Sequence, residues 1–437
     1  MRSAFLAALL VLTAAARASA SEIISVAAPI APEKVYTLDD AERLALLNDA
    51  RLLSAEQDKT IADERVRQAR YLFFPEVGLQ GSATKYEARY PFSLSNDYRN
   101  ILLFPDQPNL WGQNTGTIYS GRGYFHMNIF EGGRTLGTLR LAEAGQKQAT
   151  SAHESAKMDL LLSVKEAFYR LILAQERLTS SGDYQRAVED AVANGHLDAL
   201  ERVEAEARQA EARAKTSEAQ HGVDLARLSF LKILNVELDT PFRVEGVLEA
   251  KPVDVDIDRA VLWAIELRPE LQSETYKAQM DAISVNLAAA RRIPTIFLDS
   301  DYELTGVDFP LRNNNWDATV GIRIPFSYDY WSQLRQRKAE QRQGQLKRAE
   351  LQDRVRLEVR QAYENLLYWQ REWPLREAQL TRVQKLYADA GKGGAVLSRV
   401  RAMGSVLDLK LDYLSAVTEH IIALARLERA VGRELRP

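Results

Sequence analysis

The chain has 437 residues, with 60 acidic and 57 basic side chains and a formal net charge of −3. A mildly acidic chain of mixed charge gives no reason to expect nucleic-acid binding. The chain contains no cysteine, which excludes a disulfide framework, a thiolate zinc site, a thiol nucleophile and a lipid-anchored N-terminal cysteine.

Residues 1–20 are predicted to be a secretory signal peptide. Arg2 is followed by an apolar run from Ala4 to Ala15 and by the small residues Ala18-Ser19-Ala20, which is the pattern of a cleaved signal. A membrane anchor is the alternative, but the apolar run is too short to span a bilayer. Cleavage would remove two arginines and no acid, so the net charge would change from −3 to −5.

The sequence after an N-terminal lead (21–36) is a two-fold repeat, with one half at 37–255 and the other at 256–437. TLDDAERLALL in the first half matches DIDRAVLWAIE in the second. Identical residues recur at a spacing of 219, with Ala41, Ala45, Leu52 and Pro75 opposite Ala260, Ala264, Leu271 and Pro294. Each half therefore predicts a short helix, two strands, a long helix and a returning helix.

Four segments of about ten residues alternate between apolar and polar side chains, as strands with two different faces do. In WDATVGIRI, for example, Trp316, Val320 and Ile322 share one parity, while Asp317 and Arg323 share the other. For any single strand, the alternative is an ordinary sheet packed on a soluble core. Four such strands favour the interpretation that they belong to a membrane β-barrel. The predicted strands are Pro75–Thr84, Thr117–Ile129, Thr295–Thr305 and Trp316–Ile324.

Apolar residues at helical spacing predict two helices of unusual length, Arg134–Asn194 and Trp331–Ala390. At 1.5 Å per residue each would extend over roughly 90 Å. Shorter helices are predicted to return in stacked pairs of matching total length, and together these helices would form the wall of a tube. The pairs are Leu197–Leu234 with Pro269–Arg292, and Ala395–Val431 with Ala50–Tyr71.

Four strands are too few to close a barrel, because about eight are needed even around packed side chains. Open strand edges in lipid are costly, so several copies must share one barrel, and three copies would leave room for a polar passage. The polar side chains would then face a water-filled lumen. The predicted lumen-lining residues are Arg122, His126, Asn128, Asp299, Asp301, Glu303, Asp317 and Arg323.

The repeat, the RPEL at Arg268–Leu271 and the turn Phe130-Glu131-Gly132-Gly133-Arg134 resemble the TolC-type outer-membrane efflux proteins. The resemblance implies a homotrimer in the outer membrane of a Gram-negative bacterium, with a twelve-stranded barrel continuous with a long α-helical barrel in the periplasm. It further implies docking through a periplasmic adaptor to an inner-membrane pump of the RND or ABC type, in efflux or type I secretion. Drugs, metals and proteins remain open as substrates.

The chain departs from this family at several places. Asp49-Ala50 replaces an expected proline, and Ser327–Tyr330 lacks the glycine pair of the first strand-to-helix turn. The family often closes the periplasmic end with acidic rings. At the matching positions this chain has Glu201, Ser398 and Arg401, which are the candidate residues of a periplasmic aperture, with a solvated tip surface as the alternative.

Both long helices are predicted to be weakened at matching places. Pro374 removes a backbone hydrogen bond from the second helix, and the first helix has Thr179–Gly182, all poorer helix formers than alanine. Gly182 and Pro374 are therefore candidate hinge residues, with a fixed kink as the alternative.

A periplasmic adaptor with long helical hairpins is the rival function, but adaptors normally carry one hairpin rather than two. No enzymatic activity, cofactor or metal site is predicted, because the five histidines are scattered and no HExxH, GxSxG or phosphate-loop pattern occurs. The long loop 86–116 is expected to cap the outer mouth.

Overall fold

The computed structural model describes residues 35–87, 115–193, 198–390 and 396–435. The predicted signal peptide and most of the loop 86–116 lie outside these residues. The chain divides into two compact units, and each takes segments from both halves of the sequence. The helical unit comprises residues 1–58, 150–272 and 350–437, and the strand unit comprises residues 59–149 and 273–349.

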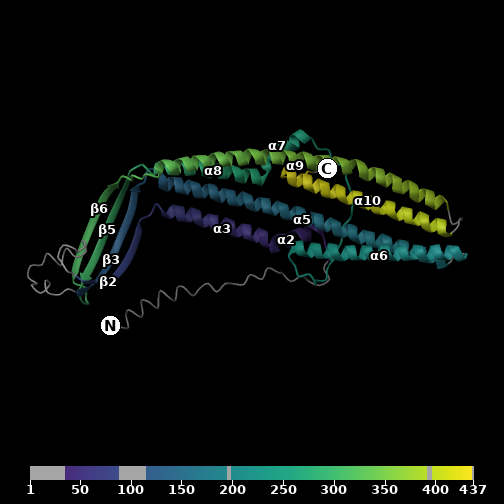
Figure 1. Cartoon of the computed structure of the whole chain (residues 1–437), viewed down its shortest axis with the longest axis horizontal. Coiled ribbons are helices and arrows are strands. Elements are labelled where there is room, and N and C mark those ends of the chain that lie inside the picture. Colours follow the sequence, from purple (N-terminus) through teal and green to yellow (C-terminus); the bar gives the residue numbers. More distant parts are fainter. Residues whose placement is uncertain (1–34, 88–114, 194–197, 391–395, 436–437) are drawn as a thin grey trace, which may run out of the picture. The chain divides into compact units, whose positions relative to one another are not determined.

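The helices and strands follow the predicted order in both halves (Figure 1). The first half contains β1 (Val35–Tyr36), α2 (Leu38–Asn48), α3 (Ala50–Tyr71), β2 (Glu76–Glu87), β3 (Thr115–Phe130), α5 (Arg134–Ala193), α6 (Ala199–Leu234) and β4 (Arg243–Val244). The second half contains α7 (Ile257–Leu267), α8 (Pro269–Ala290), β5 (Thr295–Gly306), β6 (Asn313–Arg323), α9 (Tyr330–Asp389) and α10 (Val396–Val431).

Equivalent helices of the two halves have equal lengths. Helices α2 and α7 have 11 residues each, α3 and α8 have 22, α5 and α9 have 60, and α6 and α10 have 36. The predicted ends of the long helices agree with the observed ends to within two residues. Helix α5 continues through Gly182 and α9 continues through Pro374, so the proposed hinge at these residues stays a prediction.

The helical unit contains equivalent hydrophobic cores in the two halves. In the first half, Phe168 of α5 packs against Phe230 of α6 and against the small residues that α2 presents. In the second half, Val359 of α9, Leu427 of α10 and Ala264 of α7 are buried together. Alanines on the short helices allow close approach of the backbones, which explains why alanine occupies the same repeat positions in α2 and α7.

The RPEL sequence joins α7 and α8 to three other helices through buried charges. The Arg268 guanidinium donates to Glu358 of α9 at 2.6 Å, and its side chain is only 9% exposed. Glu270 is paired with Arg429 of α10, which also donates to Asp159 of α5 at 2.7 Å. Burial alone would raise the pKa of the Glu270 carboxyl, but the guanidinium groups of Arg429 and Arg268 lower it from 4.5 to about 2.

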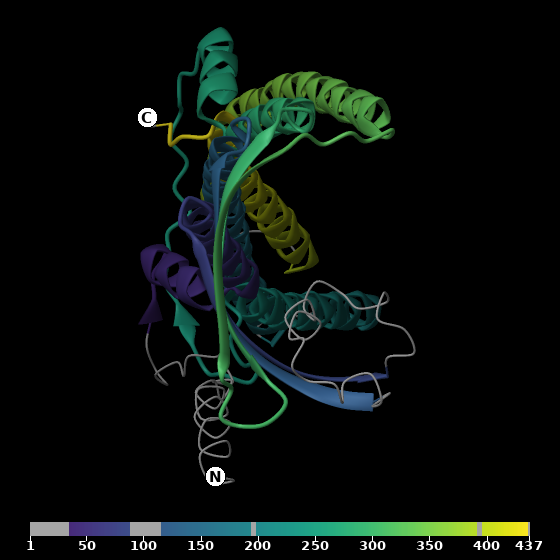
Figure 2. The same cartoon turned by 90° about the vertical axis from the view of Figure 1, so that its left-hand side faces the viewer.

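The strand unit contains one antiparallel sheet in the order β2-β3-β5-β6. Each predicted strand is present. Each pair of neighbouring strands is aligned over at least eleven residue pairs. Figure 2 shows that the sheet is strongly bent, with β2 and β3 turning away from β5 and β6. A bulge in β3 between Asn128 and Phe130 shifts the register by one residue at the end of the sheet nearest α5.

Candidate functional site

One face of the sheet carries charged side chains from all four strands. Residues that stand opposite one another in an antiparallel ladder project from the same face. Arg122 stands opposite Glu303, His126 opposite Asp299, and Asp301 opposite Asp317. Asn128 stands opposite Phe297 and Arg323 opposite Thr295, and these two residues of β5 lie on the same face as Asp299. The register therefore places all eight predicted lumen residues on one face.

Ion pairs cross the strands on this polar face. The Arg122 guanidinium lies 2.7 Å from the Asp301 carboxylate, and His126 is paired with Asp299. Glu303 forms no ion pair with a described residue. The guanidinium of Arg323 lies 5.0 Å from the centre of the Phe297 ring instead of beside an acid.

Two contacts between an aromatic ring and a glycine on the polar face were not identified from the sequence. Tyr124 donates to the Glu76 carboxylate at 3.2 Å, and its ring covers Gly78 so closely that a Cβ atom would not fit there. The ring of Phe297 covers Gly321 of β6 in the same way. These ring–glycine pairs could have been found only from the register, since neither residue type signals a polar face.

The opposite face of the sheet is apolar and exposed. Leu79 of β2 is 91% exposed, and Trp316 and Val320 of β6 are 76% and 70% exposed. Strands β2 and β6 form the two edges of the sheet among the described residues. Within the described part of the chain, apolar side chains and two rows of main-chain groups of this sheet have no covering partner, which is unusual for a soluble protein.

Aromatic residues gather where the sheet meets the helices. Arg292 lies over the rings of Tyr330 and Trp331, at 5.1 Å and 5.4 Å from their centres. Aromatic rings with polar edges are typical of membrane–water interfaces. The exposed aromatic residues here are Tyr71, Phe73, Phe74, Phe326, Tyr328 and Trp331.

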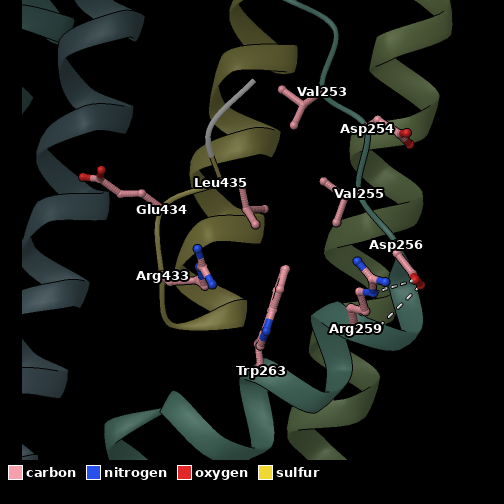
Figure 3. A pocket seen from close by; sticks show the side chains of 9 residues that line it. All are labelled: Val253, Asp254, Val255, Asp256, Arg259, Trp263, Arg433, Glu434 and Leu435. Atoms are coloured by element: carbon pink, nitrogen blue, oxygen red, sulfur yellow. Dashed lines mark hydrogen bonds and ion pairs between the residues drawn. The ribbon is translucent and has the colours of Figure 1, made fainter.

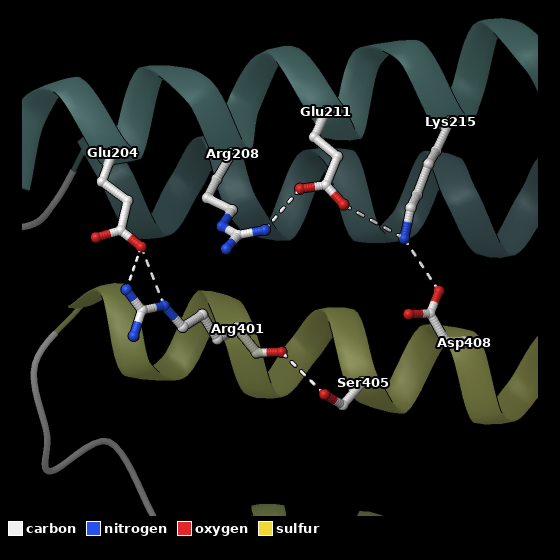
Figure 4. Close-up of polar contacts among 7 residues, drawn as sticks. All are labelled: Glu204, Arg208, Glu211, Lys215, Arg401, Ser405 and Asp408. Carbon is white, nitrogen blue, oxygen red and sulfur yellow. Dashed lines mark hydrogen bonds and ion pairs between the residues drawn. The ribbon is translucent and has the colours of Figure 1, made fainter.

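Helices α6 and α10 are joined by ion pairs near the end at which both begin (Figure 4). Arg401 of α10 is paired with Glu204 of α6. Further along, Lys215 of α6 donates to Asp408 of α10 at 3.0 Å and lies 3.7 Å from Glu211. This end of the helical unit is the tip of the hairpins, and its polar contacts are solvent-exposed.

The predicted aperture residues have different surroundings at this tip. Glu201 forms a capping box with Asp198: its carboxylate accepts from the Asp198 N–H at 2.9 Å, and the Glu201 N–H donates to Asp198 at 2.7 Å. Arg401 contacts Glu204, which the sequence did not indicate, rather than Glu201. Ser398 is exposed on α10. An aperture at Glu201, Ser398 and Arg401 therefore stays a prediction, with Glu204 added as the partner of Arg401.

No cluster of three or more histidine and carboxylate side chains is arranged to hold a metal ion in the described part of the chain. Within the same residues, none of the helices combines the length and apolar character needed to cross a membrane.

One protein-family model matches part of the chain. The sequence model described as "Outer membrane efflux protein" matches residues 42–236. No curated protein sequence matches the chain.

Solved structures show the same fold at low sequence identity. The CmeC outer membrane channel of Campylobacter jejuni is 14% identical, with a TM-score of 0.76 over 90% of this chain and 85% of that one. The open state of the MtrE outer membrane channel of Neisseria gonorrhoeae is 17% identical, with a TM-score of 0.74 over 91% and 89%. VceC of Vibrio cholerae is 15% identical, with a TM-score of 0.73 over 91% and 97%.

Proposed function

We propose that the chain is a member of the outer membrane efflux protein family, whose model matches residues 42–236, and that it is the outer-membrane exit duct of a tripartite export system. One observation carries this proposal: the four-stranded sheet has one polar face, one exposed apolar face and two open edges. Such a sheet is suited to lipid on one side and water on the other. The exporting role is passive, and no catalytic step is assigned to any residue.

Three copies would complete the barrel by pairing β2 of one chain with β6 of the next. Three four-stranded sheets make a barrel of twelve strands, and a barrel of that size exceeds the roughly eight strands whose interior is filled by side chains. The pairing would satisfy the main-chain groups of both edges, which lipid cannot do. A homotrimer with a water-filled lumen is therefore proposed, extending from the outer membrane into the periplasm.

A periplasmic adaptor and an inner-membrane pump of the RND or ABC type are the proposed partners, with the hairpin tips as the docking region. The adaptor function itself is not favoured, because each half of this chain has its own long hairpin and its own pair of membrane-type strands. The proposal is tested by purifying the full chain in detergent, measuring its mass, and recording it in planar bilayers. Three copies and discrete channels are expected; a monomer that is soluble without detergent would contradict it.

Cation selectivity is expected to depend on Glu303. The polar face carries more acids than bases, and Glu303 has no basic partner among the described residues. Glu303→Gln is expected to lower the ratio of cation to anion permeability, because it removes one negative charge per copy from the lumen. The measurement is the reversal potential in a salt gradient across a planar bilayer.

Asn315→Asp is the matched control for this experiment. Asn315 stands opposite Glu303 on β6, so the substitution adds a negative charge on the same face and should shift the reversal potential in the opposite direction. Equal reversal potentials for both variants and the unmodified protein would contradict the placement of this face in the lumen.

Single-channel conductance is expected to rise in Arg401→Ala. The substitution removes the ion pair with Glu204 that joins α6 to α10 at the tip. An exposed pair stabilises a protein by only about 0–1 kcal/mol, so the fold should persist while the aperture at the tip widens. Ser405→Ala is the control, because the Ser405 hydroxyl donates only to the Arg401 carbonyl of its own helix.

Glu201→Gln tests the contribution of Glu201 to the aperture independently of Glu204. A change in conductance or cation selectivity would support Glu201 as part of the aperture, whereas values equal to those of the unmodified channel would remove it. Arg401→Ala with unchanged conductance would contradict the role of the Glu204 pair in holding the tip closed.

A further inference from the structure

A groove in the helical unit lies beside the counterpart of strand β1 in the second half. Asp254–Val255 follow Val35–Tyr36 by 219 residues, the spacing that also relates α2 to α7. The groove has a volume of about 760 Å³ and lies between Val253–Asp256, the first turns of α7 and Arg433–Leu435 (Figure 3).

In the first half, the equivalent position is filled by strand β4. Val35 pairs in parallel with Arg243 and Tyr36 with Val244, and the Glu245 N–H donates to the Tyr36 carbonyl at 3.3 Å. Val244 is buried in the same hydrophobic cluster against which Leu44 of α2 packs. Strand β4 therefore supplies both main-chain hydrogen bonds and apolar cover.

In the second half, no described residue takes the place of β4. The main chains of Asp254 and Val255 make no hydrogen bond to another described residue. Val255 is only half-buried, whereas its counterpart Tyr36 is buried. Figure 3 shows Val255 pointing toward Leu435 and Asp254 pointing away, which is the alternation of an extended strand.

The floor of the groove has an aromatic surface where the first half has an aliphatic one. Trp263 of α7 is the counterpart of Leu44, and the guanidinium of Arg433 lies 4.6 Å from the centre of its ring. Asp254 and Glu434 also border the groove, but both side chains point away from Leu435 (Figure 3). Asp254 forms no ion pair with a described residue. Because residues that stand opposite one another in a ladder share a face, the residue paired with Asp254 is expected to be basic, and its two neighbours, which would face Leu435, are expected to be apolar.

We propose that this groove binds an extended segment of another protein, which adds as a parallel strand to Asp254–Val255. Addition of a strand to an exposed edge is a common mode of peptide recognition, in which main-chain hydrogen bonds give affinity and alternate side chains give specificity. The expected pattern is that of Phe242-Arg243-Val244 in β4, with an aromatic residue, a basic residue and a β-branched residue in succession. A second copy of this chain cannot supply its own β4, because Val244 is already buried in the first half.

The test uses a fluorescent peptide with the sequence of Thr240–Leu248 and the purified full chain in detergent. Saturable binding is expected by fluorescence anisotropy. Val255→Asp should weaken it by about tenfold or more, because it places a charge against the apolar side of the added strand. Leu262→Ala, on an exposed position of the same helix, should leave binding unchanged.

A second peptide, N-methylated at the Glu245 position, tests strand addition itself. That N–H donates to Tyr36 in the first half, so the methyl group should remove the equivalent bond to Val255 and weaken binding. Equal binding of both peptides, or no saturable binding, would overturn the proposal.

A photocrosslinking residue at position 263 or 44 identifies where the peptide binds. Labelling from position 263 supports the proposal, whereas labelling from position 44 would mean that the peptide displaces β4 and would overturn it. Crosslinks from position 263 to a second copy, or to residues 21–34 of the same chain, without added peptide would also overturn it.

Discussion

Arg429→Ala is expected to lower the free energy of unfolding by about 3–5 kcal/mol, the cost of breaking a buried ion pair by removing one partner. Arg429 is 90% buried as a side chain and serves two acids, Asp159 of α5 and Glu270 of α8. Its removal leaves the Glu270 carboxylate, which is 25% exposed, with Arg268 alone. The full chain is unfolded in detergent by increasing the guanidinium concentration, and circular dichroism measures the fraction that remains folded.

Arg354→Ala is the matched control. Arg354 also belongs to a long helix and pairs with Glu350 at 3.0 Å, but both side chains are more than half exposed. Its removal should cost at most about 1 kcal/mol. Equal losses for the two variants would contradict the assignment of Arg429 as the centre of a buried charge network.

The pH dependence of stability gives a second readout of the same network. The pKa of Glu270 is lowered from 4.5 to about 2 in the folded protein, so the unfolded chain binds a proton at a higher pH than the folded chain does. The stabilisation from Glu270 is therefore complete above about pH 4.5 and is lost as the pH falls toward 2. Glu270→Gln should be less stable than the unmodified protein at neutral pH, and the difference should shrink through this range.

Val320→Arg is expected to prevent stable assembly in the membrane, while Thr319→Arg is expected to permit it. Val320 stands opposite Leu298 on the apolar face, and Thr319 stands opposite Asp299 on the polar face. An arginine on the lipid-facing side costs about 2–4 kcal/mol near the bilayer midplane, and this cost recurs in every copy. An arginine at the neighbouring residue would enter the water-filled lumen beside acids.

The measurement for this pair is the fraction of protein that reaches the outer membrane as an oligomer resistant to mild detergent. The two variants carry the same added charge at adjacent positions, so differences in expression or net charge cannot explain a difference in assembly. Equal assembly of both variants would contradict the proposal that the apolar face meets lipid.

Much of the fold could be predicted because its signals are local and repeated. Alternation in Trp316–Arg323 identified a strand and its polar face, since the period of a strand is two residues. The ends of the long helices were marked by turn residues such as Gly132-Gly133, both of which have positive φ. Because the sequence is a two-fold repeat, each helix or strand predicted in one half was supported by its counterpart in the other half.

Other features depend on contacts that no local pattern encodes. The Arg401–Glu204 pair joins residues of different hairpins, and the capping box at Asp198 occupies the Glu201 carboxylate that the sequence alone suggested for an aperture. Strand β1 has only two residues, too few for a period to be detected. The role of RPEL likewise depends on partners 90 and 159 residues away.

The equal lengths of the paired helices restrict how a chain of this kind can evolve by insertion and deletion. One residue inserted before Phe168 would turn everything after it by about 100° around the helix axis and advance it by about 1.5 Å. The buried stripe that includes Phe168 and Leu171 would then lose its register with Phe230. Whole heptads nearly restore the original orientation, so lineages that lengthen or shorten these helices should do so in steps of about seven residues, with compensating steps in the returning helix.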